Sequence, residues 1–378
     1  MKTVQLIKKA NEDWGYVTEK IKLTKPLVLV FGDRFLLEKK DIYAEVRQLF
    51  PDGEIVFGSS CADITGSAVS ENSVSITAIE FEKSRFEIKT RNVLNIDCDS
   101  FKTGKDLIEQ FSKEGLKYLF VISEGSFVNG SQLTKGMNNA ADNKVLITGA
   151  LCGDSDRFEK TLASYNENPK QGEIVAIGFY SESLEVSFSI YGGWTPFGPE
   201  RIVTKSEGNV MFELDNQPAL DLYKKYLGDK SKELPGAALL YPLNVKSQDE
   251  TQTIVRSILN IDEENNAMIL AGDIPEGAIV QLMMTNVDNI ANASELAARR
   301  AIESREHKPE LALLVSCIGR KLVLDQRVEE EIEEIVEVVG EGITVTGFYS
   351  YGEIAPFHGE ISCQLHNQTM SVTLLSEG

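Results

Sequence analysis

A stretch near the C-terminus, GFYSYGEIAPF, carries residue types from which a ligand pocket can be built. Glycine lets the backbone turn sharply or approach another group closely, and aromatic rings beside a carboxylate can line a small site. A structural turn is the alternative interpretation, although a turn does not require three aromatic side chains in four positions. The residues that we predict to contact a ligand here are Phe348, Tyr349, Tyr351, Gly352 and Glu353.

Two other stretches repeat the same order of residues, GSSCAD at 58–63 and GALCGD at 149–154, and we call these three stretches the corners. In each corner an apolar run is followed by glycine, small polar residues and a carboxylate. Because ligands of open α/β sheets bind beyond the carboxyl ends of the strands, the corners are expected to rim one pocket. Cys152 and Asp154 are therefore candidate ligand-binding residues, and a duplicated structural turn is the alternative.

A polar side chain ends another apolar run, ELALLVSCIGR at 310–320. Arg320 has the planar guanidinium that binds a carboxylate through two hydrogen bonds, so we predict that it contacts a ligand. Arg34 follows an equivalent run. An ion pair of either arginine with Asp63 or Asp154 is the alternative.

A cysteine, a histidine and an asparagine could together form a nucleophilic site. Cys317 ends the same apolar run, and His366 and Asn367 precede the last predicted strand. In such a site the imidazole activates the thiol. A thiol inside an apolar run is more often an inert core residue. We keep Cys317 and Asn367 as ligand contacts, and a cysteine-dependent enzyme is an alternative function.

The chain has three histidines, and two of them are candidate metal ligands. His366 is either a buried structural residue or an imidazole that binds a ligand or a metal. His358 lies in a loop and is expected at the surface, and His307, after a charged run, is expected to be solvated. The sequence contains no P-loop, no dinucleotide-binding turn, no HExxH zinc motif and no GxSxG motif.

Composition indicates a globular protein without nucleic-acid or membrane partners. The formal net charge is −20, whereas nucleic acids and anionic membranes attract clustered lysine and arginine. No apolar run approaches the roughly 18–20 residues that span a bilayer. Five cysteines without a CxxC pair fit reduced thiols, so we expect a cytoplasmic location.

The elements that must hold these residues form a threefold repeat. Each copy has an apolar strand, a helix, a second strand and a corner, and the strand–helix–strand order makes the two strands parallel. The expected ranges of these three elements are 25–32, 41–50 and 53–63, then 116–123, 131–141 and 144–154, and finally 310–320, 326–340 and 343–353. Hairpins are expected at 73–92 and 172–193. We predict an α/β (mixed α+β) fold whose mixed sheets are flanked by helices, in two related domains.

A glycine- and proline-containing segment at 192–228 marks the expected domain boundary. We predict a helical lead-in over residues 1–25, an N-terminal domain over 26–215 with two repeats, and a C-terminal domain over 216–378 with the third. Within the C-terminal domain, strands are expected at AALLYPL, AMILAGD and AIVQLMMT, and a helix is expected over 294–307.

Several long motifs resemble the FIST sensory proteins, and the resemblance runs from about residue 26 onward. The motifs are GALCGDSDRFEKT, RSILNIDEENNAMILAGDIPEGAIVQLM, LVSCIGRKLVLDQRVEEEIE, GFYSYGEIAPF and LHNQT. The first corner departs from the family pattern GCSTAGEI, because GSSCADI is one residue shorter. A ligand role therefore carries over less securely to Cys61 and Asp63 than to the third corner.

The resemblance implies a sensory module and not an enzyme. Such domains are thought to bind small molecules, amino acids being the usual suggestion. They signal to a separate output protein, such as a histidine kinase or a cyclic-dinucleotide enzyme. Some FIST proteins that stand alone bind haem and sense nitric oxide, so haem held by His366 or His358 is the alternative cofactor hypothesis. A homodimer is an open alternative for the assembly.

Overall fold

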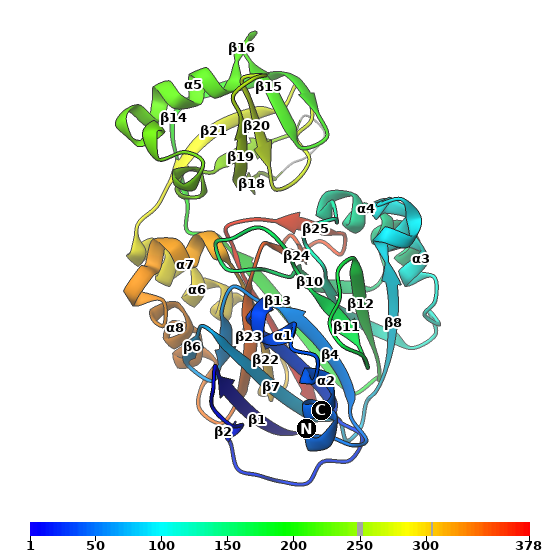
Figure 1. The fold of residues 1–378 in the computed structure, drawn as a ribbon. Coiled ribbons are helices and arrows are strands. Elements are labelled where there is room, and N and C mark those ends of the chain that lie inside the picture. Colours follow the sequence, from blue (N-terminus) through cyan, green and yellow to red (C-terminus); the bar gives the residue numbers. More distant parts are fainter. Residues whose placement is uncertain (248–251, 304) are drawn as a thin grey trace.

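The computed structural model of the protein describes residues 1–247, 252–303 and 305–378 (Figure 1). Three six-stranded sheets form most of the molecule, which we call the body. The described residues between 195 and 285 form a second sheet structure beyond it, which we call the outer lobe and which is green to yellow in Figure 1.

Three copies of a strand–helix–strand unit build the body, as the sequence repeat predicts. The first copy is β3 (Leu27–Gly32), α2 (Ile42–Leu49) and β4 (Glu54–Ser59). The second is β9 (Leu116–Ser123), α4 (Gly130–Ala141) and β10 (Leu146–Leu151), and the third is β22 (Leu311–Cys317), α8 (Glu330–Val339) and β23 (Thr344–Ser350). The two strands of each copy pair in parallel, and an antiparallel strand joins each first strand: β7 (Ser73–Glu80), β12 (Glu173–Tyr180) and β26 (Met370–Glu377).

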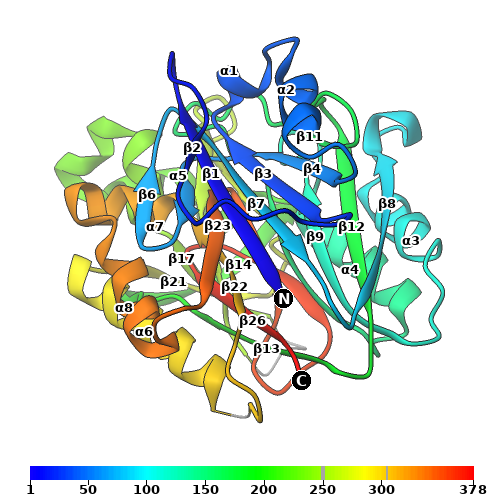
Figure 2. The same ribbon diagram turned by 90° about the horizontal axis from the view of Figure 1, so that it is seen from below.

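These strands are buried on both faces, which explains their continuous apolar sequences. Leu27, Leu29 and Phe31 of β3 join side chains of the other two units in one central cluster. Val28 and Val30, which point the other way, pack with residues of α2. The central core therefore lies between the three sheets, and helices cover their outer faces (Figure 2).

The strand after each corner leaves its own unit and pairs with a neighbouring one. β5 (Asp63–Thr65) follows β4 but pairs with β23, β11 (Ala163–Tyr165) follows β10 but pairs with β4, and β24 (Gly352–Pro356) follows β23 but pairs with β10. The corners are the points at which the chain crosses from one sheet to the next, in cyclic order.

The two expected hairpins also pass between sheets, and their strands do not pair with each other. β7 continues into β8 (Arg85–Asn92), which pairs with β12, and β12 continues into β13 (Leu184–Tyr191), which pairs with β26. Both sides of β7 are already taken by β3 and by β1 (Lys2–Lys9), so its hydrogen bonds are satisfied elsewhere. Strand β1 also replaces the helical lead-in expected over residues 1–25.

The remaining elements of the body are short or lie outside the sheets. Their bounds are α1 (Arg34–Leu37), β2 (Gly15–Tyr16), β6 (Ala68–Ser70), η1 (Val93–Ile96), α3 (Ser100–Ile108), α6 (Val287–Ile302), α7 (Ile318–Leu324), η4 (Asp325–Arg327) and β25 (Cys363–His366). Helix α6 begins earlier than the expected residue 294, because the Asn286 side chain caps it by accepting a hydrogen bond from Asn289 N.

The outer lobe is an eight-stranded sheet with one helix and two 3₁₀ turns. Its elements are β14 (Thr195–Glu207), β15 (Val210–Leu214), β16 (Gln217–Pro218), α5 (Ala219–Leu227), η2 (Gly228–Glu233), η3 (Gly236–Leu240), β17 (Leu243–Lys246), β18 (Ile254–Arg256), β19 (Ile258–Asp262), β20 (Ala267–Leu270) and β21 (Ile279–Met284). AMILAGD and AIVQLMMT begin strands as predicted. AALLYPL is mostly the turn η3, because Pro242 delays the next strand until Leu243. The division at residues 215 and 216 stays a prediction about domains.

Candidate functional site

The three corners meet one another through a cyclic set of backbone hydrogen bonds. The bonds run from Gly153 N to Ser59 O at 2.9 Å, from Tyr351 N to Leu151 O at 3.1 Å, and from Cys61 N to Tyr349 O at 2.9 Å. The structure thus brings together the stretches that the sequence singled out. They pack closely, however, and the cavity beside the first corner holds only about 20 Å³. That volume suits about one water molecule.

Two corner carboxylates are buried and held by hydroxyl groups. Glu353 accepts hydrogen bonds from Ser350 Oγ at 2.8 Å and from Thr369 Oγ1 at 2.7 Å. Asp63 accepts from two serine hydroxyls, at 2.5 and 2.8 Å. Burial raises the pKa of Glu353 to about 7 and that of Asp63 to about 8, although the hydroxyl hydrogen bonds act in the opposite direction.

The carboxylate of the second corner is neutralised by two arginines. Arg157 Nε donates to Asp154 Oδ1 at 2.8 Å, and Arg34 Nε lies 3.1 Å from the same oxygen. The exposed ring of Phe35 lies 4.3 Å from the Arg34 guanidinium and 4.7 Å from that of Arg157. The ion-pair alternative therefore holds for Arg34 and Asp154.

Arg320 pairs with neither Asp63 nor Asp154, but with Glu331. Its Nη2 lies 2.7 Å from Glu331 Oε2, and both side chains are fully buried. Tyr349 Oη donates to the other oxygen of Glu331 at 2.5 Å. These contacts bind Arg320 and Tyr349 to the interior of the third unit, and their contact with a ligand stays a prediction.

The other two aromatic residues of the third corner also pack inside the protein. The Phe348 ring stacks on Phe31 with ring centroids 4.4 Å apart, inside the central core. The Tyr351 ring stacks on Phe158 at 4.3 Å, and its hydroxyl donates to Ser155 O at 3.2 Å. Gly352, the next residue, begins strand β24. Ligand contact by these three residues also stays a prediction.

The structure gives no support to a Cys-His-Asn site. Cys317 and Cys152 are buried free thiols, and burial raises the pKa of both well above the ordinary value, which disfavours the reactive thiolate. His366 Nε2 donates to Ala355 O at 3.0 Å and not to a thiol. The Asn367 side chain is buried and has no hydrogen-bond partner among the described residues.

The histidines do not fit a haem site. His366 is buried and packs perpendicular to the Phe357 ring, with centroids 4.8 Å apart, and burial lowers the pKa of its imidazole to about 4. His358 is exposed on the turn after β24, and His307 is exposed as expected. Within residues 1–247, 252–303 and 305–378, no three metal-ligating side chains of His, Cys, Asp or Glu form a group that could hold a metal ion.

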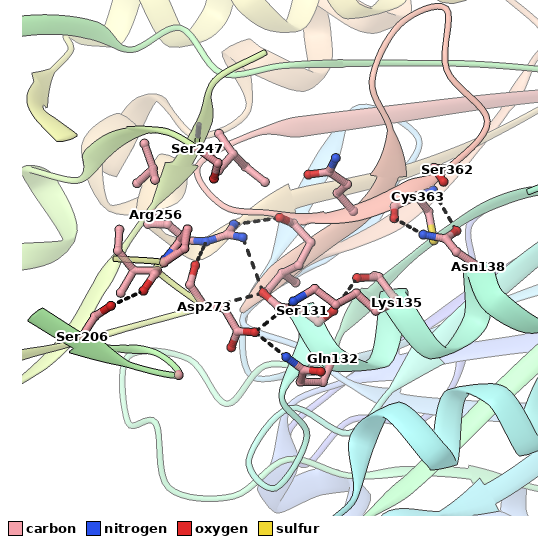
Figure 3. A pocket seen from close by; sticks show the side chains of 18 of the residues that line it. Ser131, Gln132, Lys135, Asn138, Ser206, Ser247, Arg256, Asp273, Ser362 and Cys363 are labelled. Carbon is pink, nitrogen blue, oxygen red and sulfur yellow. Dashed lines mark hydrogen bonds and ion pairs between the residues drawn. The ribbon is translucent and has the colours of Figure 1, made fainter. Parts of the chain in front are cut away.

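A larger cavity, of about 560 Å³, lies where the outer lobe meets the body, and we call it the lobe pocket (Figure 3). Helix α4 and the segment around β25 form its body side, and strands and loops of the lobe form the other side. Its lining residues are Ser131, Gln132, Thr134, Lys135, Asn138, Ser206, Gly208, Val245, Ser247, Ile254, Arg256, Asp273, Ile274, Pro275, Glu276, Ser362, Cys363, Gln364 and Leu365. None of the residues that the sequence predicts to bind a ligand or a metal lines this pocket.

The carboxylate of Asp273, on the lobe, binds the first turns of α4, on the body. Asn129, which caps α4, donates through Nδ2 to Asp273 Oδ1 at 2.9 Å, and Gln132 Nε2 donates to Oδ2 at 2.5 Å. Lys135 Nζ lies 3.4 Å from the same Oδ2. Burial alone would raise the pKa of Asp273, but these hydrogen bonds and the lysine charge outweigh it and lower the pKa.

Arg256 is the second polar link between lobe and body. Its guanidinium is buried and donates through Nη1 to Leu365 O of β25 at 2.8 Å and through Nε to Asp273 O at 3.3 Å. The Ser131 hydroxyl of α4 accepts from Asp273 N at 3.1 Å. Figure 3 shows the side chains of Arg256 and Asp273 reaching from the lobe toward the body. The pocket wall therefore carries two basic side chains, Arg256 and Lys135, and two acidic ones, Asp273 and Glu276.

The sequence did contain a signal for this site. Arg256 and Asp273 both lie in RSILNIDEENNAMILAGDIPEGAIVQLM, one of the motifs that resemble FIST proteins. The motif gave no reason to single out these two side chains, because their partners in α4 are more than 120 positions away. Only the placement of the lobe on the body makes the cavity.

Comparison with known proteins places the chain in a family. The FIST N domain matches residues 26–217, and the FIST C domain matches residues 219–356. The chain belongs to the FIST family. FIST domains are sensory domains, so the coarse expectation of a sensory protein is confirmed. This finding does not support the haem-binding, nitric-oxide-sensing subgroup.

Two curated relatives are similar in sequence. An uncharacterized protein of Mycobacterium tuberculosis is 26% identical over 252 residues, which are 64% of this chain and 63% of that protein. An uncharacterized protein of Methanocaldococcus jannaschii is 26% identical over 211 residues, which are 50% of this chain and 39% of that protein. The FIST chain thus spans about 63% and 39% of the lengths of these relatives.

Two solved structures match over most of the FIST chain. A chorismatase structure covers 99% of this chain and 98% of its own, with 8% identity and a TM-score of 0.36. A cyanuric acid hydrolase from A. caulinodans covers 92% and 90%, with 8% identity and a TM-score of 0.35. Both are enzymes by their names, against the expectation from the family resemblance that this chain is not an enzyme, and that expectation is not kept. At these TM-scores the likeness assigns no reaction to this chain.

Among the described residues, no helix combines the length and the apolar character needed to cross a bilayer.

Proposed function

We propose that this FIST protein senses a small, polar, non-aromatic molecule in the lobe pocket, an amino acid or a similar metabolite. The observation that carries the proposal is the pocket itself, a cavity of about 560 Å³ between two parts of the chain. Ligand sites commonly have volumes of about 300–1,000 Å³ and lie between domains. The tightly packed corners offer much less room, about 20 Å³ beside the first one.

The lining of the pocket indicates the chemistry of the ligand. Hydroxyl and amide side chains alternate with Arg256, Lys135, Asp273 and Glu276, and the lining contains no aromatic ring. Haem or a nucleotide base would be held by stacking and a large apolar surface, which this wall does not offer. A molecule with both an acidic and a basic group would find a partner for each.

The output partner is part of the proposal. Sensory FIST domains pass their signal on, and we expect a separate protein such as a histidine kinase or a cyclic-dinucleotide enzyme to receive it. The expected cytoplasmic location agrees with such a partner. A homodimer stays an alternative assembly.

The test is a thermal-shift screen of the purified protein with the twenty amino acids, small dicarboxylates and polyols, followed by calorimetric titration of each hit. Two variants separate the two sites. Lys135→Met changes a pocket-lining side chain that is 61% exposed and should fold normally. Glu353→Gln changes the third corner and leaves the pocket intact. We expect the first variant to weaken binding at least tenfold and the second to leave it unchanged.

Other results would contradict the proposal. If Glu353→Gln or Tyr351→Ala abolishes binding and Lys135→Met does not, the corners are the ligand site. If no compound stabilises the protein, the pocket is not a metabolite site of this class. Haemin titration belongs to the same series, and a sharp Soret band lost in His366→Ala or His358→Ala would contradict the proposal in favour of a haem sensor.

A further inference from the structure

We propose that the outer lobe is a clamp, held closed by a polar latch at Asp273 and turning about a hinge at Gly193 and Thr285. The identity of the ligand rests on the proposed function, whereas the motion of the lobe does not. It assigns to the lobe pocket a form of regulation, in which a bound molecule stabilises the closed arrangement because both walls contact it.

The latch is entirely polar and reaches across the pocket. Asp273 of the lobe binds three side chains of the body, from Asn129, Gln132 and Lys135. Its carboxylate lies at the N-terminal end of α4, where the helix dipole also favours a negative charge. The Asp273 side chain is 18% exposed, so water can replace these hydrogen bonds when the contact opens. A contact of this kind is reversible at modest cost.

The lobe has a hydrophobic core of its own, so it can move as a unit. That cluster consists of lobe residues, among them Val203, Met211, Leu222 and Leu282. From the body, Phe357 packs against it. The main clusters of the body are separate from it. A small apolar cluster that includes Trp194, Met283, Ile290 and Leu324 joins lobe and body near the connecting segments, so the two parts stay in contact there when the rest of the interface opens.

The hinge is formed by the two chain segments that connect lobe and body. One leaves β13 through Gly192 and Gly193, and the other returns from β21 through Thr285 to α6. Thr285 Oγ1 donates to Gly193 O at 2.7 Å, so the two crossings are tied at one point. Gly193 has φ of +84°, and an added Cβ would lie 2.5 Å from Asn289 O. A glycine is required there for both reasons, and it supplies the backbone freedom of a hinge.

The test measures the distance between lobe and body by double electron–electron resonance. Spin labels are attached to cysteines introduced by Asp229→Cys on the lobe and Lys113→Cys on the body. The native side chains at these positions are 98% and 59% exposed. The exposed Cys98 is replaced by serine so that it takes up no label. Asp273→Ala removes the latch. Asp221→Ala, an exposed carboxylate on α5 outside the pocket, is the matched control. We expect a single narrow distance in the parent and the control, and a broader, longer distribution in Asp273→Ala.

A distribution in Asp273→Ala that matches the parent would overturn the inference. Thr285→Val provides a second measurement that does not touch the latch, and we expect it to broaden the distribution without changing pocket residues. A narrow distribution in Thr285→Val would overturn the assignment of the hinge to Gly193 and Thr285. If the distribution opens without ligand but no compound in the thermal-shift screen binds, the clamp stands and the proposed function fails.

Discussion

The guanidinium of Arg320 and the carboxylate of Glu331 form a fully buried ion pair, with 2.7 Å between Nη2 and Oε2. The pair joins α7 to α8, and hydroxyl groups of Ser316, Ser294 and Tyr349 complete the hydrogen bonds of the carboxylate. Removing one member of such a pair leaves an uncompensated charge in the core, which costs about 3–5 kcal/mol.

We therefore expect Glu331→Gln to lower the free energy of unfolding by roughly that amount, about 3–5 kcal/mol, measured by urea denaturation. The neighbouring Glu330 is the control, because it makes a surface ion pair with Arg327. Glu330→Gln should cost about 1 kcal/mol or less. Equal losses in the two variants would show that the buried pair contributes no more than the surface one.

Asp63 should make stability fall as pH rises. Its pKa is raised to about 8 by burial, so the folded protein holds a proton that the unfolded chain releases near its ordinary pKa of 3.8. The stabilising effect is complete below about pH 4 and is lost as pH rises to about 8, with a total on the order of 5 kcal/mol. We expect Asp63→Asn to lose less stability than the parent over this range, measured by denaturation at each pH. Asp221→Asn should follow the parent, and a parallel curve for Asp63→Asn would refute the assignment.

His366 should make the stability of the protein fall as the pH is lowered below about 6.5. Burial lowers the pKa of its imidazole to about 4, and the charge of Arg256 acts in the same direction, so the neutral ring is favoured in the folded protein. The contribution is complete above the ordinary pKa of 6.5 and is lost as pH falls to about 4, with a total of about 3 kcal/mol. We expect the imidazole to titrate below pH 5 by NMR, whereas His307, exposed on the surface, serves as the reference. A His366 pKa near 6.5 would contradict its burial.

Gly347 should not tolerate a side chain. A Cβ at this position would lie well inside contact distance of Leu314 O on the neighbouring strand. We expect Gly347→Ala to destabilise the protein by about 1–3 kcal/mol or more, because the paired strands must separate. Gly236 has no heavy atom within 4 Å of an added Cβ, so Gly236→Ala is the control. The measurement is the thermal midpoint, and equal midpoints would show that β22 and β23 adjust freely.

The strand–helix–strand repeat could be predicted because it is local. Continuous apolar runs such as LVLVFG predict strands buried on both faces, and the spacing of Val46 and Ile42 predicts the helix face that covers them. These periodicities depend on neighbours within about ten positions, so they are legible in the chain. The three corners could be found for the same reason, since each repeats a short motif.

The pairing of β5 with β23, of β11 with β4 and of β24 with β10 could not be predicted. A strand of three to five residues can add to several edges, and the choice depends on which edge remains free when all three sheets close around one core. The turns at 81–84 and 181–183 were predicted to close hairpins for the same reason. In the structure they carry the chain from one sheet to another.

The sequence by itself determined the units, the family motifs and the excess of negative charge. Tertiary structure alone decided which polar residues face open space. Asp273 meets Asn129 across 144 positions, and Tyr351 meets Ser155 across 196. The first contact borders a cavity and the second fills the interior. Composition cannot distinguish them, because burial is a property of the packed neighbours and not of the residue type.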